Sequence, residues 1–196
     1  MEKTARLILD FDGTLTSSVG KFTVWSDFYK KFLKNPDNVK NYSTEEYKDE
    51  KTILQIMKEY DQHTKNRYSE MYGITNESLW FIRENLKNEK IKITIISKNR
   101  KEYIVASLKY KGLTNEEINK ITIFDASYNK YKKELVLLSE EKCEKATVIM
   151  ICDDDHAELL AQKQGLSKFE NVEVYCHPVG KFEWKTIKNK LDEYLR

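Results

Sequence analysis

Two aspartates one residue apart, Asp10 and Asp12, are the first residues of the sequence whose types and spacing could support catalysis. They follow the apolar run Leu7 to Leu9 and precede Gly13 and a threonine. Such a run is typical of a strand buried on both faces of a parallel sheet, and open α/β sheets bind ligands at the carboxyl ends of their strands. Two carboxylates so close together repel each other, and oxygen ligands of this kind suit Mg²⁺. The stretch therefore predicts an active site that holds a divalent cation.

The acidic pair could instead cap a helix or bind calcium. An EF-hand calcium loop is not indicated, because Leu15 stands where that loop needs glycine and Lys21 where it needs glutamate. His156 and His177 lie near predicted strand ends, but cysteine or histidine partners at metal-ligand spacing are absent from the sequence around them. The strand that precedes Asp10 therefore favours a catalytic role over a structural one.

Length, charge and cysteine content narrow the class of protein. The 196 residues suffice for one core of about 150 residues plus an insert, but not for two full domains. With 34 Lys and Arg against 32 Asp and Glu, the net charge of +2 provides no basic field, so nucleic acid is not the expected partner. The sequence has no apolar run of about 20 residues that could cross a membrane. Its three cysteines form no CxxC motif, so we expect reduced thiols and a cytoplasmic location.

The remaining elements must position these acids, and their pattern alternates between strands and helices. A polar loop at 14–22 is expected to form a flap over the site, helical spacing occupies 24–33, and a capping box at 43–46 opens a helix to about 72. Further helices are predicted at 76–87, 101–111, 131–144, 156–164 and 184–195, with strands KITIIS, ITIFDA, TVIMICD and VEVYCH between them. Gly112 and Gly165 are expected to end two helices, and a second capping box begins at Thr114. Five strands separated by helices predict an α/β fold with a doubly wound, Rossmann-like parallel sheet.

Polar residues gather at the carboxyl ends of these predicted strands. Beyond the first acidic pair, strands end at Ser97, at Asp125 and at the run Asp153 to Asp155. Because the carboxyl ends of parallel strands meet at one edge of a sheet, we expect these side chains to converge on a common site.

The pattern resembles the haloacid dehalogenase superfamily, through DFDGTL at 10–15, which matches that family's first motif DxDGT[LV]. Ser97 closes a hydrophobic strand, as the serine or threonine of the second motif does. Asp153 matches the first acid of the fourth motif, since VIMICDDDHAELLAQKQG reproduces the motif's strand, acid, helix and glycine.

The fourth motif also departs from the family's pattern. Cys152 replaces the glycine that usually precedes the acid, and Ala157 stands where the common form has its second acid. Asp154 or Glu158 could take the place of that second acid beside the metal, and the two alternatives stay open.

The lysine of the third motif is less sharply defined. KYKKELV at 130–136 aligns with the family's frequent KPxPExF and indicates Lys130, although both prolines are absent. Lys132 and Lys133 are close rivals for the same role.

The resemblance implies a Mg²⁺-dependent phosphatase with an aspartyl-phosphate intermediate. Asp10 is expected to attack phosphorus, and Asp12 to donate a proton to the leaving oxygen and later to take one from water. The Asp10 carboxylate, the Asp12 backbone carbonyl and Asp153 are the expected metal ligands, while Ser97 and Lys130 hold phosphate oxygens. An aspartate at position 12 favours phosphomonoester hydrolysis, because a dehalogenase needs no acid for its halide and transport ATPases of this pattern carry threonine there.

The resemblance also implies a domain organisation and a range of substrates. The catalytic domain is expected to comprise 1–22 and 75–196, with 23–74 as a small helical cap inserted after the first strand. A small cap leaves the pocket open to a phosphorylated protein side chain, including phosphotyrosine, and a small phosphorylated metabolite is an equal alternative. A phosphotransferase or mutase with the same intermediate is the nearest rival, and a non-catalytic phosphate-binding regulatory domain of the response-receiver type is a more distant one.

Overall fold

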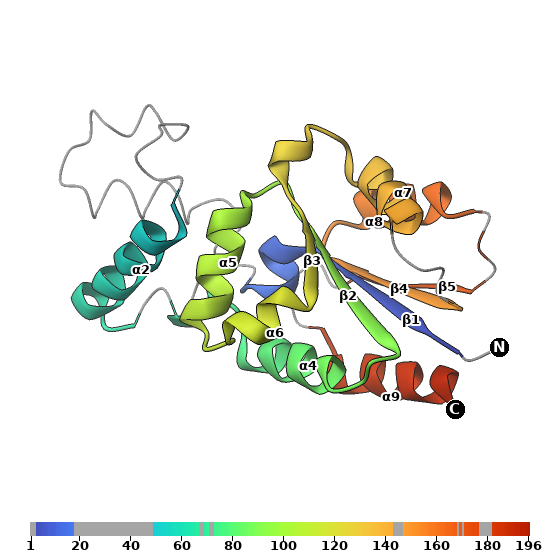
Figure 1. Ribbon diagram of the computed structural model, residues 1–196, viewed down its shortest axis with the longest axis horizontal. Coiled ribbons are helices and arrows are strands. Elements are labelled where there is room, and N and C mark those ends of the chain that lie inside the picture. Colours follow the sequence, from blue (N-terminus) through green and yellow to red (C-terminus); the bar gives the residue numbers. More distant parts are fainter. Residues whose placement is uncertain are drawn as a thin grey trace.

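A computed structural model places a five-stranded parallel sheet at the centre of the chain (Figure 1). The structure describes residues 3–17, 49–66, 69–70, 73–142, 147–167, 169, 171–176 and 182–196. The strands lie in the order β3-β2-β1-β4-β5, and every neighbouring pair is parallel. Their bounds are β1 Ala5–Leu9, β2 Ile91–Ile96, β3 Ile121–Phe124, β4 Val148–Asp153 and β5 Val172–Cys176.

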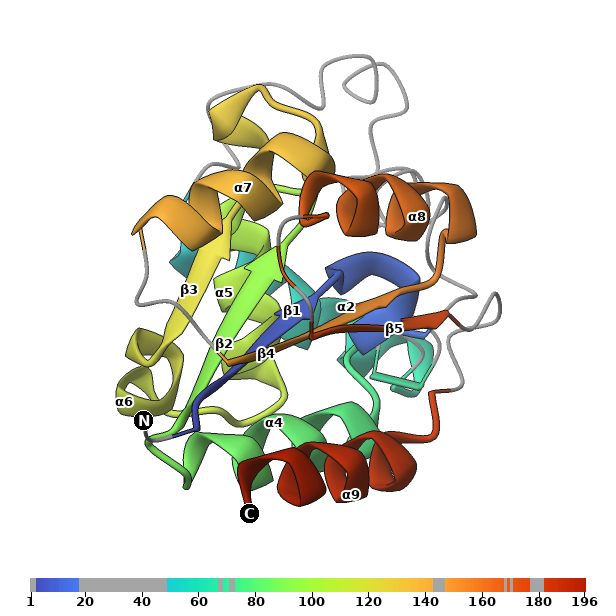
Figure 2. The same cartoon turned by 90° about the vertical axis from the view of Figure 1, so that its right-hand side faces the viewer.

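Helices cover both faces of this sheet. α4, α5 and α9 lie on one face and α7 and α8 on the other, as two perpendicular views show (Figure 1 and Figure 2). α2 packs against the outer side of α5. The helical segments in the described residues are η1 Phe11–Leu15, α2 Glu50–Thr64, α4 Asn76–Leu86, α5 Lys101–Tyr110, α6 Asn115–Asn119, η5 Ala126–Tyr128, α7 Lys132–Lys142, α8 His156–Gly165 and α9 Trp184–Leu195. The predicted doubly wound α/β fold is confirmed.

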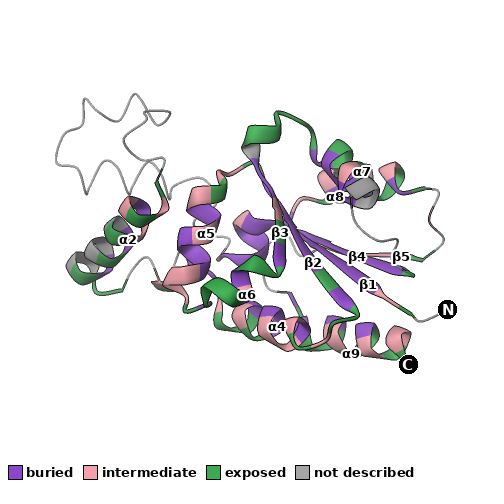
Figure 3. Cartoon of the chain, in the orientation of Figure 1, coloured by how far each residue is buried: buried purple, intermediate pink, exposed green. Residues whose placement is uncertain are grey.

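The two central strands, β1 and β4, are buried along their whole length, as Figure 3 shows. Side chains alternate across β1, so Leu7 and Leu9 pack with the core under α4, α5 and α9. Ile8 packs with the core under α7 and α8 on the opposite face. Burial on both sides explains why this strand reads as a continuous apolar run in the sequence.

The register of the central strands brings the predicted acids together. Leu9 at the end of β1 lies beside Cys152 of β4, and the Asp10 backbone N–H donates to the Cys152 carbonyl at 2.9 Å. Asp10 and Asp153, the next residues along each chain, therefore leave the sheet side by side.

Several predicted helix boundaries are confirmed, and their caps explain them. The Thr75 side chain accepts from the Ser78 backbone N–H at the start of α4. Thr114 and Glu117 form the predicted capping box of α6. Gly112 has φ +101°, a left-handed conformation that ends α5 as expected.

Three predictions are wrong in detail. α2 ends at Thr64, not near residue 72, because Lys65 adopts a left-handed conformation with φ 55°. Thr14 and Leu15 lie in η1 and Thr16 follows it; all three are buried and not in a flap, and Thr16 forms an isolated bridge with Ile74. Gly165 is the last residue of α8 and not the first residue after it, and a Cβ there would come within 3.3 Å of the Lys133 carbonyl, so it also allows close packing of α8 on α7.

Other predictions fall outside the described residues, namely the helix at 24–33, the capping box at 43–46 and the rest of the flap at 18–22. The assignment of 23–74 as a cap stays a prediction. Within that span, α2 is anchored to the core because the buried Asp61 carboxylate accepts from the Tyr110 hydroxyl of α5 at 2.5 Å.

Candidate active site

The turn after β1 positions the first acids of the site. Gly13 has φ +84°, and a Cβ built on it would lie 2.5 Å from the Asp154 carboxylate. Any other residue there would be strained in its backbone and would displace Asp154. The Thr14 hydroxyl accepts from the Asp154 backbone N–H at 3.0 Å and donates to Asp10 at 3.3 Å. Gly13 and Thr14 of the first motif therefore join the ends of β1 and β4.

Three buried carboxylates converge at this edge of the sheet. Asp10, Asp153 and Asp154 each offer an oxygen, and these oxygens lie within 4.8 Å of one another. Their side chains come from the ends of β1 and β4, so the rigid centre of the sheet sets their spacing. Such a group of hard oxygen ligands suits Mg²⁺.

Asp154 belongs to this acidic group, which answers one question that the sequence leaves open. Glu158 contacts the lysines of the site: one of its oxygens lies 2.7 Å from the Lys132 ammonium, and it also pairs with Lys98. Asp154 therefore lies beside Asp153 in the acidic group, where a second acid of the fourth motif is expected, while Glu158 pairs with lysines.

Lys132, and not Lys130, lies at the predicted nucleophile. Its ammonium group is 2.7 Å from Asp10 Oδ1 and 2.9 Å from Asp153 Oδ2, and the residue is only 7% exposed. Lys130 is exposed. Lys132 is the first residue of α7, whose start is fixed because the Tyr131 N–H donates to Glu134 Oε2 at 2.9 Å. The alignment that indicated Lys130 is off by two residues because the prolines that would define the turn are absent.

Burial dominates the electrostatics of this group. Desolvation raises the pKa of Asp10 to about 8, an effect that the Lys132 charge reduces and the Asp153 charge increases. Burial by itself would lower the pKa of Lys132, but the charges of Asp10 and Asp153 outweigh it and raise that pKa, so the ammonium keeps its proton.

A divalent cation fits this arrangement. The three clustered carboxylates carry three negative charges when ionised, and Lys132 offsets one of them. The remaining excess of two charges matches one Mg²⁺, and a cation beside Asp10 would favour its ionised form. Asp10, Asp153 and Asp154 are the residues whose side chains would hold it.

Asp12 faces a different set of partners. Its carboxylate accepts from the Ser97 hydroxyl at 3.3 Å and from the Asn99 amide at 3.4 and 3.3 Å. The carboxylate of Asp12 is therefore not part of the acidic group, and the metal role predicted for this residue concerns its backbone carbonyl. Ser97 lies at the predicted place, at the end of β2, and is 2% exposed.

No protein-family model and no curated protein matches the sequence. Solved structures do match its fold. The structure of the Legionella pneumophila effector Ceg4 that carries an N-terminal yeast Hog1p sequence is 27% identical, covers 99% of this chain and 96% of its own, and has a TM-score of 0.75. The HAD domain of the Legionella pneumophila effector Lem4 is 23% identical over 99% of this chain and 96% of its own, also with a TM-score of 0.75. A HAD family enzyme from Bacteroides thetaiotaomicron is 14% identical over 95% of this chain and 99% of its own, with a TM-score of 0.55.

The fold of the chain is that of the haloacid dehalogenase structures it resembles. The resemblance carried by DFDGTL at 10–15 is thereby confirmed. The haloacid dehalogenase fold presents its candidate site at the carboxyl ends of β1, β2 and β4, where the structure gathers Asp10, Ser97 and Asp153. Asp125 follows β3, but its carboxylate accepts from the Lys101 N–H at 2.9 Å and from the Ser127 hydroxyl at 2.6 Å. Its role is thus to fix the start of α5.

Sequence reasoning missed two polar residues of this haloacid dehalogenase site. Asn99 contacts Asp12, and Gln162 of α8 donates to Asp153 Oδ2 at 2.8 Å while being 1% exposed. Asn99 follows the predicted strand end at Ser97 by only two residues, so its position in the sequence could have indicated that it lies near the site. Gln162 lies within a helix, and only the packing of α8 on the sheet reveals its contact.

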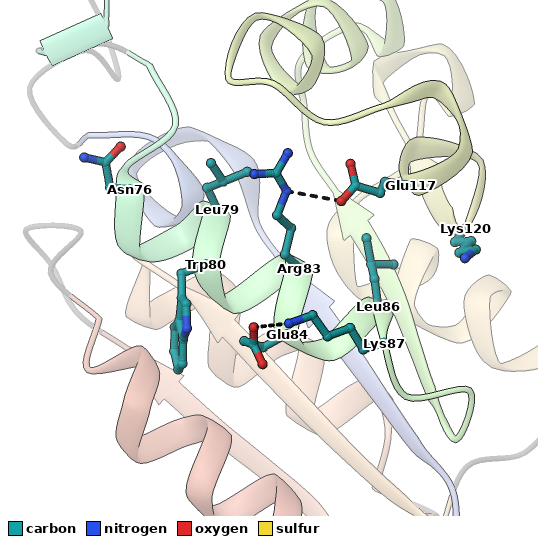
Figure 4. A pocket seen from close by; sticks show the side chains of 9 residues that line it. All are labelled: Asn76, Leu79, Trp80, Arg83, Glu84, Leu86, Lys87, Glu117 and Lys120. Atoms are coloured by element: carbon teal, nitrogen blue, oxygen red, sulfur yellow. Dashed lines mark hydrogen bonds and ion pairs between the residues drawn. The ribbon is translucent and has the colours of Figure 1, made fainter.

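A pocket along α4, away from these acids, has a different character (Figure 4). Its charged groups form exposed pairs, Arg83 with Glu117 at 3.1 Å and Lys87 with Glu84 at 2.5 Å. Among the described residues, the group of acids that could hold a metal lies at the carboxyl edge and not here. The helices of the described ranges include none that is both long and apolar enough to cross a membrane.

Proposed function

We propose that the chain is a Mg²⁺-dependent phosphomonoester hydrolase that works through an aspartyl-phosphate intermediate. One observation carries this proposal: the buried Lys132 ammonium bridges Asp10 and Asp153 at 2.7 and 2.9 Å, with Asp154 in the same acidic group. A phosphate monoester is a dianion, so an anionic nucleophile can approach it only where cations neutralise the transferring group. The likeness to HAD family structures supports this class of reaction.

The residues of the site have separable roles in the proposed reaction. Asp10 attacks phosphorus, because its carboxylate is rigidly placed at the end of β1 and lies next to Lys132. Lys132 and Ser97 bind oxygens of the phosphoryl group. Asp12 donates a proton to the leaving oxygen and then accepts one from the water that hydrolyses the intermediate. When bound between the carboxylates, Mg²⁺ supplies Lewis-acid charge to the phosphoryl oxygens.

The proposed substrates are a phosphorylated side chain of a protein, including phosphotyrosine, or a small phosphorylated metabolite. The predicted cap at 23–74 is only about 50 residues long, and a cap of this size would leave the site accessible to a side chain presented by a protein. Ceg4 and the Lem4 domain are effectors by their own descriptions, which supports testing protein substrates beside metabolites.

Hydrolysis of 4-nitrophenyl phosphate by the native protein and by Asp10→Asn, each with Mg²⁺ and with EDTA, tests the proposal. We expect turnover that requires Mg²⁺, and a loss of at least about 10³-fold in Asp10→Asn because the nucleophile is removed. Asp61→Asn is the matched control, since Asp61 is also a buried acid but lies outside the acidic group, in α2, where its carboxylate accepts from the Tyr110 hydroxyl. Equal rates for native protein and Asp10→Asn would refute the nucleophile assignment.

The alternatives predict other results in the same assay. A phosphotransferase or mutase would form the phosphorylated Asp10 but release phosphate slowly unless an acceptor alcohol is added. A regulatory phosphate-binding domain would be inactive while still binding phosphate analogues. Phosphotyrosine peptides, sugar phosphates and nucleotides compared under the active condition then identify the substrate class by their kcat/KM values.

A further inference from the structure

We propose that Asn99 is a positioning residue that orients the carboxyl group of Asp12 toward the leaving oxygen of the substrate. The inference rests on the proposed function, in which Asp12 is the proton donor. It adds a residue that the motifs of the sequence do not include, and it explains how a half-buried side chain in an irregular turn can keep one orientation.

The contacts of Asp12 define the problem. Asp12 has φ −79° and ψ 117°, so it departs from the helical turn around it and its side chain is not held by a regular element. The Asn99 amide nitrogen lies 3.4 Å from one carboxylate oxygen and 3.3 Å from the other, and Ser97 Oγ lies 3.3 Å from the second. An amide that reaches both oxygens restricts rotation of the carboxyl plane, which a single donor cannot do.

The orientation of the Asn99 amide follows from its other contacts. Its Oδ1 accepts from the Arg100 backbone N–H at 2.9 Å. Because the oxygen end is used by a backbone donor, the NH₂ end must face Asp12. The Asn99 backbone N–H donates to Ser97 Oγ at 3.0 Å, so the backbone of Asn99 holds the other side chain that contacts Asp12.

The loop that carries Asn99 is anchored at both ends. At its start the Ser97 N–H donates to the Phe124 carbonyl at 3.0 Å. At its end the Lys101 N–H donates to the buried Asp125 carboxylate at 2.9 Å. Residues 97–100 therefore form a short bridge from β2 to α5 whose position is set by β3. A rigid support of this kind is what precise placement of a catalytic group requires.

The chemical consequence concerns the first step of the reaction. As the Asp10 oxygen bonds to phosphorus, the bond between phosphorus and the leaving oxygen breaks and its electron pair stays on that oxygen. The proton leaves Asp12 and bonds to the same oxygen, while the electrons of the O–H bond stay on the Asp12 carboxylate. A proton on Asp12 must use a lone pair that Asn99 and Ser97 do not use, so these donors determine the direction in which it is offered.

Leaving groups of different basicity separate this role from a structural one. Phenol, with a pKa of about 10, leaves poorly without a proton, whereas 2,4-dinitrophenol leaves as the anion. The experiment compares kcat/KM for phenyl phosphate and for 2,4-dinitrophenyl phosphate in the native protein, Asn99→Leu, Asn99→Ala and Asp12→Asn. kcat/KM reports formation of the intermediate and is insensitive to its later hydrolysis.

We expect kcat/KM of both Asn99 variants to fall roughly 10-fold to 100-fold with phenyl phosphate and less than about 3-fold with 2,4-dinitrophenyl phosphate. Asp12→Asn should show the same dependence on the leaving group, with a larger loss. The retained rate with the dinitrophenyl ester shows that a variant is folded. Asn171→Leu is the matched control, because the Asn171 amide donates to the Thr147 carbonyl at the opposite edge of the sheet. This control should behave as the native protein with both esters.

The failures of the two proposals differ. Suppose that Asp12→Asn shows the leaving-group dependence, but that kcat/KM of the Asn99 variants falls equally with both esters or does not fall. The positioning role is then refuted and the proposed function stands. If the native protein hydrolyses neither ester faster than Asp10→Asn does, the proposed function fails and the positioning role fails with it.

Discussion

The carboxyl edge of the sheet and the outer surface of α4 differ in how they hold charge. At the carboxyl end, Asp10, Asp153 and Asp154 are buried with one lysine. Along α4 on the outside of the molecule, ion pairs such as Arg83 with Glu117 stay partly exposed (Figure 4). Exposed pairs contribute little to stability, whereas a buried excess of like charge is costly. We infer that the buried charges of the carboxyl edge serve the proposed reaction and that apolar packing elsewhere supplies the stability.

An aromatic cluster between α4 and α9 is one part of this apolar packing. Trp184, at the start of α9, stacks on Phe81 of α4 with ring centroids 4.6 Å apart. It also stacks on Phe182 at 4.9 Å. All three side chains are buried. The comparison thus predicts that mutations in the aromatic cluster lower stability alone, whereas mutations of the buried charges also lower activity.

Replacing Lys132 should produce the largest effect. Lys132→Met removes the cation that bridges Asp10 and Asp153, so we expect the phosphatase rate to fall by at least about 100-fold and the free energy of unfolding by about 3 to 5 kcal/mol. Because the Lys132 charge lowers the pKa of Asp10, its loss raises that pKa further. A carboxyl group whose folded pKa is raised destabilises the protein as pH rises through that pKa. The native Asp10 ionises near pH 8, so the stability deficit of the variant, whose Asp10 ionises at higher pH, should grow as pH rises above about 8.

Lys130→Met is the matched control for this substitution. Lys130 is exposed and lies two residues away, so its replacement should change the unfolding free energy by less than about 0.5 kcal/mol and leave the rate intact. Denaturant unfolding at several pH values, with 4-nitrophenyl phosphate assays beside it, measures both. A loss of rate in Lys130→Met with none in Lys132→Met would overturn the placement of the lysine.

Replacing Trp184 should lower stability without lowering the catalytic rate. Trp184→Ala leaves a cavity between Phe81 and Phe182, and we expect it to cost about 3 to 5 kcal/mol of unfolding free energy. At a temperature where the variant is folded, its kcat should stay close to that of the native protein. Trp80→Ala is the control, because Trp80 is 37% exposed and should cost much less. A large loss of kcat in folded Trp184→Ala would show that the aromatic cluster and the candidate active site are coupled.

The sequence predicts the strands and the acids of the site better than the partners of those acids. The apolar run before Asp10 specifies a buried strand, and parallel strands bring their carboxyl ends to one edge, so Asp10, Ser97 and Asp153 were placed from local pattern alone. Lys132 was not distinguished from Lys130, because the choice depends on the residue at which α7 begins. That start depends on a contact between Tyr131 and Glu134 that the pattern does not specify.

Contacts between distant segments account for what else was missed. The distinction between Asp154 and Glu158 depends on the geometry of Gly13, whose missing side chain leaves room for the Asp154 carboxylate. Gln162 contacts Asp153 only through the packing of α8 on the sheet. The end of α2 at Thr64 depends on left-handed backbone at Lys65, a conformation that lysine does not favour.

The capping box of α6 offers the smallest test, on the surface and away from the buried acids. Thr114 Oγ1 accepts from the Glu117 N–H at 3.1 Å, and the Thr114 N–H donates to Glu117 Oε2 at 2.8 Å. Thr114→Ala should cost about 1 kcal/mol of unfolding free energy at every pH, because a neutral acceptor is lost. The Thr114 N–H holds the pKa of Glu117 below its usual range, and the Arg83 side chain and charge lower it further.

A carboxyl group whose pKa is lowered by folding stabilises the folded protein at pH values above its ordinary pKa. This stabilisation is lost as pH falls through the lowered pKa. Glu117→Gln should therefore destabilise the protein slightly at pH 7, and its difference from the native protein should shrink below about pH 4. Urea unfolding of both variants at pH 3.5 and pH 7 measures the two profiles. If Glu117→Gln loses the same unfolding free energy at both pH values, the Glu117 carboxylate acts through its hydrogen bonds alone. The exposed ion pair between Arg83 and Glu117 would then contribute no electrostatic stability, in contrast to the buried charges of the carboxyl edge.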